Sequence, residues 1–466
     1  MNVRRWSLTL LIVLVAGMLA ACGGGTTQSG ATTGPAGGET AATTAPVAGG
    51  ETAATAPAAG GETAAGTLPA DCSNVALDYW NPFTGPDGPF MGTLTDNFNA
   101  ANPNIQVVMT SQAEYYTQLG TAAASNSLPD VAIVHADQVA TQAFRNVLRP
   151  IDDLVSQIGV SESDFPAPVW GAGEVAGKRY SIPLDIHPGV LYYNMDLLSG
   201  AGISAAPTNQ AEFDAAALAL TAGDTKGFLI TSGFFSAQTF QTLLHQFGGS
   251  EFNADGTAAS FNSEAGVRAL QWMQDVQTKY GELNLETDAE INGFKAGGAG
   301  MMMNGIWQIT NVTGDAVEFQ GQGTAVPQFG EQPAVWAGSH QLTLPAQSDA
   351  DPCRDAAAGI FIKYLLDNSI EWSKAGQIPA SNAVRESAEF QALQPQALIA
   401  PSVENAFFPP SVPGITDALG PMGEAVSAIM AGTQTDIKAA LDEAAGRSDQ
   451  ILAENKTNFG DAPAGQ

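Results

Sequence analysis

The sequence predicts an α/β protein whose globular part is divided into two lobes. From Asp71 onward roughly 390 of the 466 residues remain, which is more than one hydrophobic core usually serves. Within this part, short apolar runs that read as strands alternate with helical stretches. This alternation is typical of β-α-β units and indicates a largely parallel sheet.

The first half of the globular part contains the clearest alternation. Val75–Trp80 alternates apolar and polar residues, and 130–135 is a continuous apolar run bounded by a turn signal. A Gly/Pro-rich turn covers residues 83–89. The predicted strands are 75–80, 105–110 and 130–135, and the predicted helices run through Leu94 and Phe98, ending before Pro103, and over 115–124.

The second half is predicted from helix caps and apolar periodicity. Asn209 and Glu212 form the capping pattern of a helix start, and 263–279 is an amphipathic helix. Two extended segments, 178–185 and 189–193, are broken by His187-Pro188. Further strands are predicted at 300–304, with Met301–Met303 buried, and at 334–344. Helices are predicted at 356–366 and around 448–455.

The N-terminus is predicted to be a signal peptide, residues 1–21. Arg4 and Arg5 precede an uncharged apolar stretch, which is too short for a stable membrane span. The following Leu19-Ala20-Ala21-Cys22 resembles the bacterial lipobox, so Cys22 is expected to carry lipid. The protein is then exported and anchored to the membrane on its extracytoplasmic side. The alternative is an ordinary cleaved signal with an incidental cysteine.

Residues 22–70 are expected to be the lipidated cysteine followed by a disordered linker. Residues 23–69 contain no Lys, Arg, Phe, Tyr, Trp or Ile, and they repeat Gly-Gly-Glu-Thr-Ala-Ala from Gly37, Gly49 and Gly60. Such a segment cannot bury enough apolar surface to offset the entropy lost on ordering.

Charge and cysteine content narrow the range of partners. A net charge of -30 argues against nucleic acid and against bare anionic lipid, so the lipid anchor is the expected membrane contact. The scarcity of Lys and Arg also argues mildly against phosphorylated ligands.

Cys72 and Cys353 are the cysteines of the globular part. In an oxidising compartment they are a possible disulfide, with no C-x-x-C motif present.

Several candidate ligand-binding residues follow predicted strands, where doubly wound sheets bind their ligands. They combine aromatic rings, short carboxylates and imidazoles without Lys or Arg. This mixture suits a carbohydrate, whose C–H faces lie on aromatic planes while its hydroxyls need donors and acceptors. Core packing for each Trp and a structural role for each His are the alternatives. The candidates are Trp80, Asn81, His135, Asp137, Asp185, His187, Tyr193, Trp307, Trp336 and His340.

Several stretches in this order resemble family-1 extracellular solute-binding proteins, the sugar-binding lipoproteins of ABC importers related to maltose-binding protein. The stretches are LDYWNPFTGPDGPFMGTLTDNFNAANPNIQV, SLPDVAIVHADQ, RYSIPLDIHPGVLYYNMDLLSGAGI, FKAGGAGMMMNGIW and AAGIFIKYLLDNSIEWSKAGQIPASNAV. The resemblance implies a periplasmic-binding-protein fold, with crossing hinge segments and a cleft between the lobes. It places one lobe at 71–184 plus 329–366 and the other at 185–328 plus 367–460. It also implies that Trp307 stacks on sugar.

The implied function is to bind a carbohydrate, favoured as an oligosaccharide, and to deliver it to the permease subunits of an ABC importer. We expect a monomer that needs no cofactor or metal and catalyses no reaction. Two alternatives remain open. A secreted carbohydrate-active hydrolase would use paired carboxylates, but no nucleophile motif is present. A metal-binding receptor would use His135, His187 and His340 with Asp137 or Asp185, although these histidines are far apart in the sequence. Phe234 and Phe235 are expected in the core rather than in the cleft.

Overall fold

The computed structural model describes residues 67–349, 351–460 and 463, which belong to one compact unit, Glu62–Gln466. The predicted signal peptide, Cys22 and residues 23–66 of the predicted linker lie outside the described residues. Within the described part of the chain, no helix is long and apolar enough to cross a membrane.

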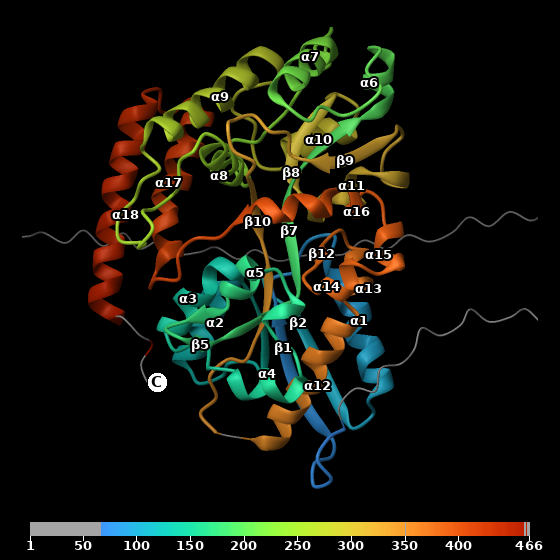
Figure 1. Ribbon diagram of the computed structural model, residues 1–466, viewed down its shortest axis with the longest axis vertical. Helices are drawn as coiled ribbons and strands as arrows, with labels where there is room; N and C mark the ends of the chain where they lie inside the picture. The colour runs from blue at the N-terminus through green and yellow to red at the C-terminus, as the bar shows by residue number, and fades with distance from the viewer. Residues whose placement is uncertain (1–66, 350, 461–462, 464–466) are drawn as a thin grey trace, which may run out of the picture. The chain divides into compact units, whose positions relative to one another are not determined.

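Two sheets organise the fold (Figure 1). The first has the strand order β2-β1-β3-β11-β6, in which β1, β2 and β3 are parallel and β11 is antiparallel to β3 and β6. Its strands are β1 (Val75–Asn81), β2 (Ile105–Ser111), β3 (Val131–His135), β6 (Ser181–Pro183) and β11 (His340–Thr343).

The second sheet is built around the ten-residue strand β7. The first half of β7 pairs with β12 and β10, and its second half pairs with β8 and β9, always antiparallel; β13 adds a parallel partner to β10. A separate hairpin joins β4 (Glu174–Val175) and β5 (Lys178–Arg179). The strands of the second sheet are β7 (Asp185–Asn194), β8 (Met301–Gly305), β9 (Gly321–Ala325), β10 (Val335–Gly338), β12 (Ile378–Pro379) and β13 (Ala406–Phe407).

The chain crosses between the sheets in two short segments and in one long one, residues 344–377 between β11 and β12. It leaves the first sheet at β6, passes Leu184 and enters β7, and it returns from β10 through Ser339 into β11. Figure 1 shows β7 and β10 running between the two lobes. The two short crossings hold both sheets in one molecule and lie at the base of the space between the lobes.

Helices and short 3-10 turns cover both sheets. The α-helices that precede β8 are α1 (Gly88–Ala101), α2 (Tyr115–Ala124), α3 (Ala136–Phe144), α4 (Asp152–Ile158), α5 (Ala167–Gly171), α6 (Met195–Gly200), α7 (Gln210–Leu220), α8 (Ser236–Gln246), α9 (Glu264–Tyr280) and α10 (Ala289–Lys295). Those that follow are α11 (Ile309–Val312), α12 (Pro352–Asp367), α13 (Ser369–Ser373), α14 (Asn382–Arg385), α15 (Ala388–Ala392), α16 (Gln396–Ile399), α17 (Ile415–Met430) and α18 (Ile437–Phe459). The 3-10 turns are η1 (Glu162–Asp164), η2 (Ile306–Gln308), η3 (Gly314–Ala316) and η4 (Ala400–Asn405).

The second sheet separates two large hydrophobic clusters. Along β8, Met302 belongs to the cluster that extends into the first lobe, whereas Met301 and Met303 belong to the cluster under α7, α8, α9, α17 and α18. This alternation follows from the period of two along a strand. All three methionines are buried, as predicted, and the predicted cap of α7 is present: the Asn209 side chain accepts from the Glu212 backbone N–H at 3.1 Å.

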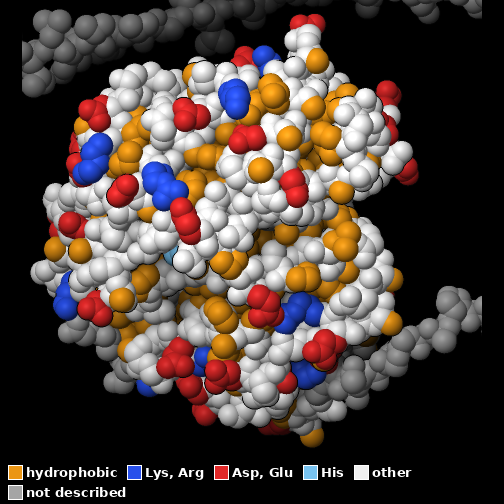
Figure 2. All heavy atoms as spheres, turned by 45° about the horizontal axis from the view of Figure 1, so that its top comes forward, with side chains coloured by type: hydrophobic (Ala, Val, Ile, Leu, Met, Phe, Trp, Pro, Cys, Tyr) orange, Lys and Arg blue, Asp and Glu red, His pale blue; other side chains and the backbone are white. Residues whose placement is uncertain are grey.

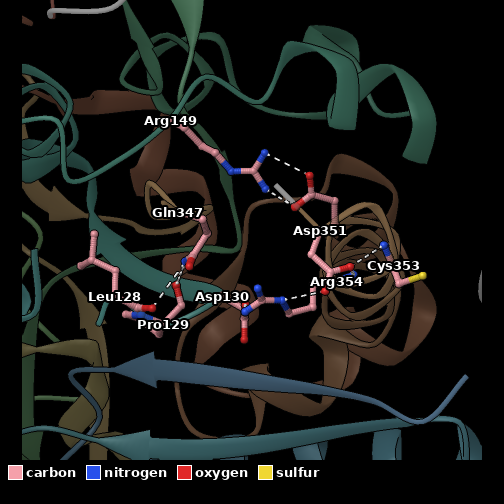
Figure 3. A network of polar contacts seen from close by, with 9 residues as sticks. Leu128, Pro129, Asp130, Arg149, Gln347, Asp351, Cys353 and Arg354 are labelled. Atoms are coloured by element: carbon pink, nitrogen blue, oxygen red, sulfur yellow. Dashed lines mark hydrogen bonds and ion pairs between the residues drawn. The ribbon is translucent and has the colours of Figure 1, made fainter. Parts of the chain in front are cut away.

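The start of α12 is tied to the first lobe by covalent and polar links. Cys72, just before β1, forms a disulfide with Cys353, with the two Cα atoms 5.4 Å apart. Arg354 contacts Asp130 before β3 at 3.3 Å, and Arg149 pairs with Asp355. Figure 3 shows the polar contacts of this region, in which Gln347 also donates to backbone carbonyls beside Asp130.

The structure corrects three sequence-based predictions. His187-Pro188 does not break the chain into two segments, because the fixed φ of proline fits extended backbone and β7 runs through both residues. The strand predicted over 334–344 is two strands divided at Ser339, where the chain changes sheets. The prediction of a largely parallel sheet holds for β1, β2 and β3 and for the short pair β10–β13, whereas the crossing strands enter both sheets antiparallel. The predicted lobe boundaries, 71–184 plus 329–366 and 185–328 plus 367–460, stay a prediction.

Candidate functional site

A cleft of about 560 Å³ lies where the ends of β1 and β3, the crossing strands and helices α8 and α17 meet. Figure 2 shows that one face of the molecule is hollowed, with hydrophobic side chains exposed around the hollow. The aromatic lining residues are Phe83, Tyr116, Phe234, Trp307, Trp336, Phe407 and Phe408. The ionisable and amide side chains are Asp87, His135, Asp137, Gln138, His187, Gln238, Gln241, Glu251 and His340.

A buried carboxylate organises the base of this cleft. Asp185 begins β7 and is fully buried. One carboxylate oxygen accepts from His187 Nδ1 and from the His340 backbone N–H, both at 3.0 Å; the other accepts from His340 Nδ1 at 2.7 Å and from Trp372 Nε1 at 2.6 Å. Burial alone raises the pKa of Asp185, but His340 and the hydrogen bonds from both imidazoles outweigh it and hold the pKa below its usual range.

Asp185 therefore determines how two imidazoles are oriented. As a carboxylate it only accepts, so Nδ1 of both His187 and His340 carries a proton and Nε2 of each is turned elsewhere. The ring centroids of these two histidines are 4.2 Å apart. Burial and the neighbouring His340 lower the pKa of His187 to about 4, so its imidazole is neutral at pH 7.

A third imidazole joins this pair from β3. His135 ends β3 and stands opposite His340 in the β3–β11 register, with ring centroids 4.9 Å apart. Its Nδ1 lies 2.6 Å from the Tyr116 hydroxyl, which also accepts from the His135 backbone N–H at 3.0 Å. Burial, with the neighbouring imidazoles of His340 and His187, places the pKa of His135 well below its usual range.

Two indole rings form the aromatic wall of the cleft. The centroid of Trp307 lies 6.3 Å from that of Trp336 and 6.2 Å from that of Phe234, whose side chain is 58% exposed. Trp307 follows Gly305 at the turn after β8. A Cβ at Gly305 would lie 2.1 Å from the indole, so only glycine lets the ring lie back against this turn.

Asp137 supplies a carboxyl group from the first turn of α3. Burial raises its pKa to about 6, although hydrogen bonds from its own backbone N–H and that of Gln138 oppose the rise. The carboxyl group lines the cleft together with Asp87 and Glu251, whereas the lining contains no Lys or Arg.

The structure brings most of the predicted site residues together. His135, Asp137, His187, Trp307, Trp336 and His340 line the cleft, and Asp185 lies directly behind two of them. Three others are not in the lining. Trp80 packs against the cluster of Tyr115 and Val134, Asn81 is fully buried, and Tyr193 faces the opposite cluster, where its hydroxyl donates to Gln322 at 2.7 Å.

Other lining residues were missed by the sequence analysis. Phe234 was expected in the core, but it follows a Ser-Gly pair at the start of α8 and projects into the cleft, whereas Phe235 is buried. Phe83 lies in the Gly/Pro-rich turn after β1, a position that could have singled it out. Phe407 and Phe408, from the Pro-rich stretch before α17, carried no local signal.

Comparison with known proteins gives similarities over most of the chain. The family described as bacterial extracellular solute-binding protein matches residues 93–395. The sn-glycerol-3-phosphate-binding periplasmic protein of Pectobacterium atrosepticum is 24% identical over 345 residues, which is 68% of this chain and 75% of that protein.

Solved structures with the same fold cover more of the chain. An ABC substrate-binding protein from Listeria monocytogenes in complex with cycloalternan superposes with a TM-score of 0.72 at 20% identity, covering 82% of this chain and 99% of that one. The GacH receptor of Streptomyces glaucescens, solved unliganded and with acarbose, gives a TM-score of 0.71 at 22% identity, with 82% and 100% covered. At these sequence identities, the similarity shows that the fold is shared and nothing further.

Proposed function

The chain belongs to the bacterial extracellular solute-binding proteins, and from this premise we propose that it binds a carbohydrate, favoured as an oligosaccharide, for an ABC importer. The observation that carries this proposal is the composition of the cleft. It combines the indole rings of Trp307 and Trp336 with carboxyl, amide and imidazole groups. Ring faces and hydroxyl pairs of a sugar need this combination, and about 560 Å³ lies in the range of small-molecule sites.

Because no cationic side chain among the described residues lines the cleft, a neutral sugar suits it better than a phosphate ester does. Proteins bind phosphate oxygens through Arg, Lys or helix N-termini. In this cleft, three carboxyl groups, those of Asp87, Asp137 and Glu251, face the same space. A phosphate dianion would meet repulsion there, although the curated relatives include several sn-glycerol-3-phosphate-binding periplasmic proteins. A carbohydrate avoids that cost and uses the same carboxylates as hydroxyl acceptors.

Binding would work by closure of the two lobes about the crossing segments. We propose the lobes 71–184 plus 329–366 and 185–328 plus 367–460, with β6–β7, β10–β11 and the α12–α13 junction as the crossings. Trp307, from the second sheet's β8 turn, and Asp137, after the first sheet's β3, would then contact one ligand together. A ligand that contacts both lobes stabilises the closed form by its differential affinity.

Export and anchoring complete the proposal. Cys22 would hold the protein by lipid at the extracytoplasmic face of the membrane, where a monomer would pass its ligand unchanged to the permease subunits. The roughly 45-residue segment behind Cys22 has the composition of a flexible linker, which would let the receptor reach the permease. Family membership supports binding and transport rather than catalysis.

The test is isothermal titration calorimetry of the purified protein with mono- to tetrasaccharides, with sn-glycerol 3-phosphate and glycerol as comparators. We expect heat and a raised Tm with at least one oligosaccharide, and a smaller radius of gyration in small-angle scattering. Binding of sn-glycerol 3-phosphate alone, or no thermal shift with any sugar, would overturn the carbohydrate proposal.

A further inference from the structure

Three histidines that are far apart in the sequence meet at the base of the cleft. One ring nitrogen of each of His135, His187 and His340 lies within 4.8 Å of those of the other two. They come from β3, β7 and β11. In the β3–β11 register, His340 stands opposite His135, and in the β7–β10 register, Gly338 stands opposite His187. The cluster therefore has a rigid, sheet-based support.

Each imidazole is held from behind through Nδ1. His187 and His340 are both bonded to Asp185, and His135 is bonded to the Tyr116 hydroxyl. This arrangement leaves Nε2 of each ring without a hydrogen-bond partner among the described residues. Metal-ligating histidines characteristically pass their other ring N–H to a carboxylate or another oxygen acceptor, which fixes the tautomer and the orientation of the ring.

The surroundings of the cluster favour a cation. Asp87, Asp137 and Glu251 line the same cleft, whose lining has no Lys or Arg, and the whole chain carries a net charge of -30. Gly338 keeps His187 uncovered, because a Cβ at that position would lie 2.1 Å from its Nε2. The cluster is also the one group of three or more His, Cys, Asp or Glu with metal-ligand spacing among residues 67–349 and 351–460.

We propose that His135, His187 and His340 form a binding site for a divalent transition-metal cation, with Zn²⁺ as the best match, at the floor of the cleft. Three neutral imidazoles are a ligand set that zinc accepts, with a fourth position open to water or a ligand. Zn–N bonds of about 2.0–2.1 Å require the three nitrogens to approach each other from the present separation. The open position would face the space proposed for carbohydrate, but the inference does not rest on carbohydrate binding.

The test is a zinc titration of the purified, chelator-treated protein without any sugar, followed by dialysis and elemental mass spectrometry. We expect one Zn²⁺ per chain, and Co²⁺ as a spectroscopic probe should give visible absorption bands of an imidazole-bound ion. No zinc retained above the level of a buffer blank, or zinc retained by His135→Gln as well as by the unmodified protein, would overturn the proposal.

Two variants and a control distinguish the loss of a metal ligand from the loss of the folded structure. His135→Gln removes one ligand without touching the Asp185 network and should lower zinc affinity by about 100-fold or more. Tyr116→Phe keeps all three ligands but removes the oxygen that holds His135 Nδ1. As a positioning change, it should lower affinity by about 10- to 100-fold.

His245→Gln is the matched control, because His245 is the fourth histidine of the chain and pairs with Glu251 outside the cluster. Its zinc affinity should equal that of the unmodified protein. Loss of zinc in this control comparable to the loss in His135→Gln would contradict the assigned site. Thermal melts of the zinc-free forms check that each variant is folded.

Discussion

Asp185 illustrates how much a single residue's role depends on its surroundings. From its place after a predicted strand it was expected to contact ligand through its carboxylate. In the structure it is fully buried and accepts four hydrogen bonds, three of them from His187 and His340. A buried charge needs such partners to offset the loss of hydration. Asp185 therefore orients cleft residues and does not itself line the cleft.

Trp307 gives the first prediction at this scale. Trp307→Ala should weaken carbohydrate binding by about 10- to 100-fold, because a stacked aromatic ring buries apolar area worth about 1.5–3 kcal/mol. Calorimetry with the best-binding sugar measures the change. Trp307→Phe keeps an aromatic plane and should recover most of the affinity. Unchanged affinity in the alanine variant would remove Trp307 from the proposed site.

Glu290 predicts a pH dependence of stability. Its side chain is 1% exposed and accepts from Asn304 at 2.8 Å, and burial raises its pKa to about 7. Between pH 4.5 and 7 the folded state then holds a proton that the unfolded state releases, so the free energy of unfolding falls as pH rises through this window. Glu290→Gln lacks this term. Relative to that of the unmodified protein, the free energy of unfolding of this variant should therefore rise by about 1 to 3 kcal/mol between pH 4.5 and pH 8.

Urea unfolding of the Glu290→Gln variant at the two pH values measures this difference. Glu282→Gln, at an exposed position before α10, is the control and should follow the unmodified protein at both pH values. A difference of the opposite sign for Glu290→Gln would show that the carboxyl group is stabilised as the anion in the folded state.

At the scale of elements, β7 connects the two parts of the fold. Its ten residues are all buried, and they pair with β10 and β12 at one end and with β8 and β9 at the other. Burial on both faces explains its nearly continuous apolar sequence. The exceptions are Asp185 and His187 at the crossing, where the strand passes the base of the cleft, and Asn194 at the other end, whose side chain caps α6.

The link between Cys72 and α12 gives the element-scale prediction. The disulfide closes a chain segment of 281 residues and ties the approach to β1 to the first turn of α12. Cys72→Ser with Cys353→Ser should lower the free energy of unfolding by about 2–5 kcal/mol, because the unfolded chain gains conformational freedom. Urea unfolding measures the loss. The unmodified protein in reductant should match the double variant, and equal midpoints with and without reductant would contradict the prediction.

At the scale of the whole molecule, the acidic charge, the cleft and the proposed anchor suit one task. A receptor held beside a permease raises the local concentration of loaded protein without any change in its affinity for ligand. The net charge of -30 keeps such a protein soluble and away from anionic lipid headgroups.

Cys22 carries the prediction at this scale. Cys22→Ala should leave the carbohydrate dissociation constant within about twofold, because the proposed lipid chains would contribute membrane affinity alone, at about 0.8 kcal/mol per buried CH₂. Cell fractionation should show release of the variant from the membrane, and uptake of labelled sugar should fall. Full uptake with the protein entirely released would mean that anchoring is not what the lipid contributes.

The sequence by itself was sufficient for features that depend on neighbouring residues. The strands around Leu77 and Ile133, the cap at Asn209 and the amphipathic helix α9 follow from local periodicity and capping, which read the same in any fold. The acidic charge and the absence of common catalytic motifs are likewise properties of composition, as is the disorder predicted for residues 23–69.

Only the tertiary structure decided which of these residues meet. His135, His187 and His340 carry no mutual spacing signal, and they converge because β11 pairs with β3 and β10 pairs with β7 in specific registers. A shift of one residue in either register would turn a histidine to the other face of its sheet. Strand pairing of this kind joins distant parts of the chain, so neither the imidazole cluster nor the burial of Asp185 behind it could be derived from local sequence.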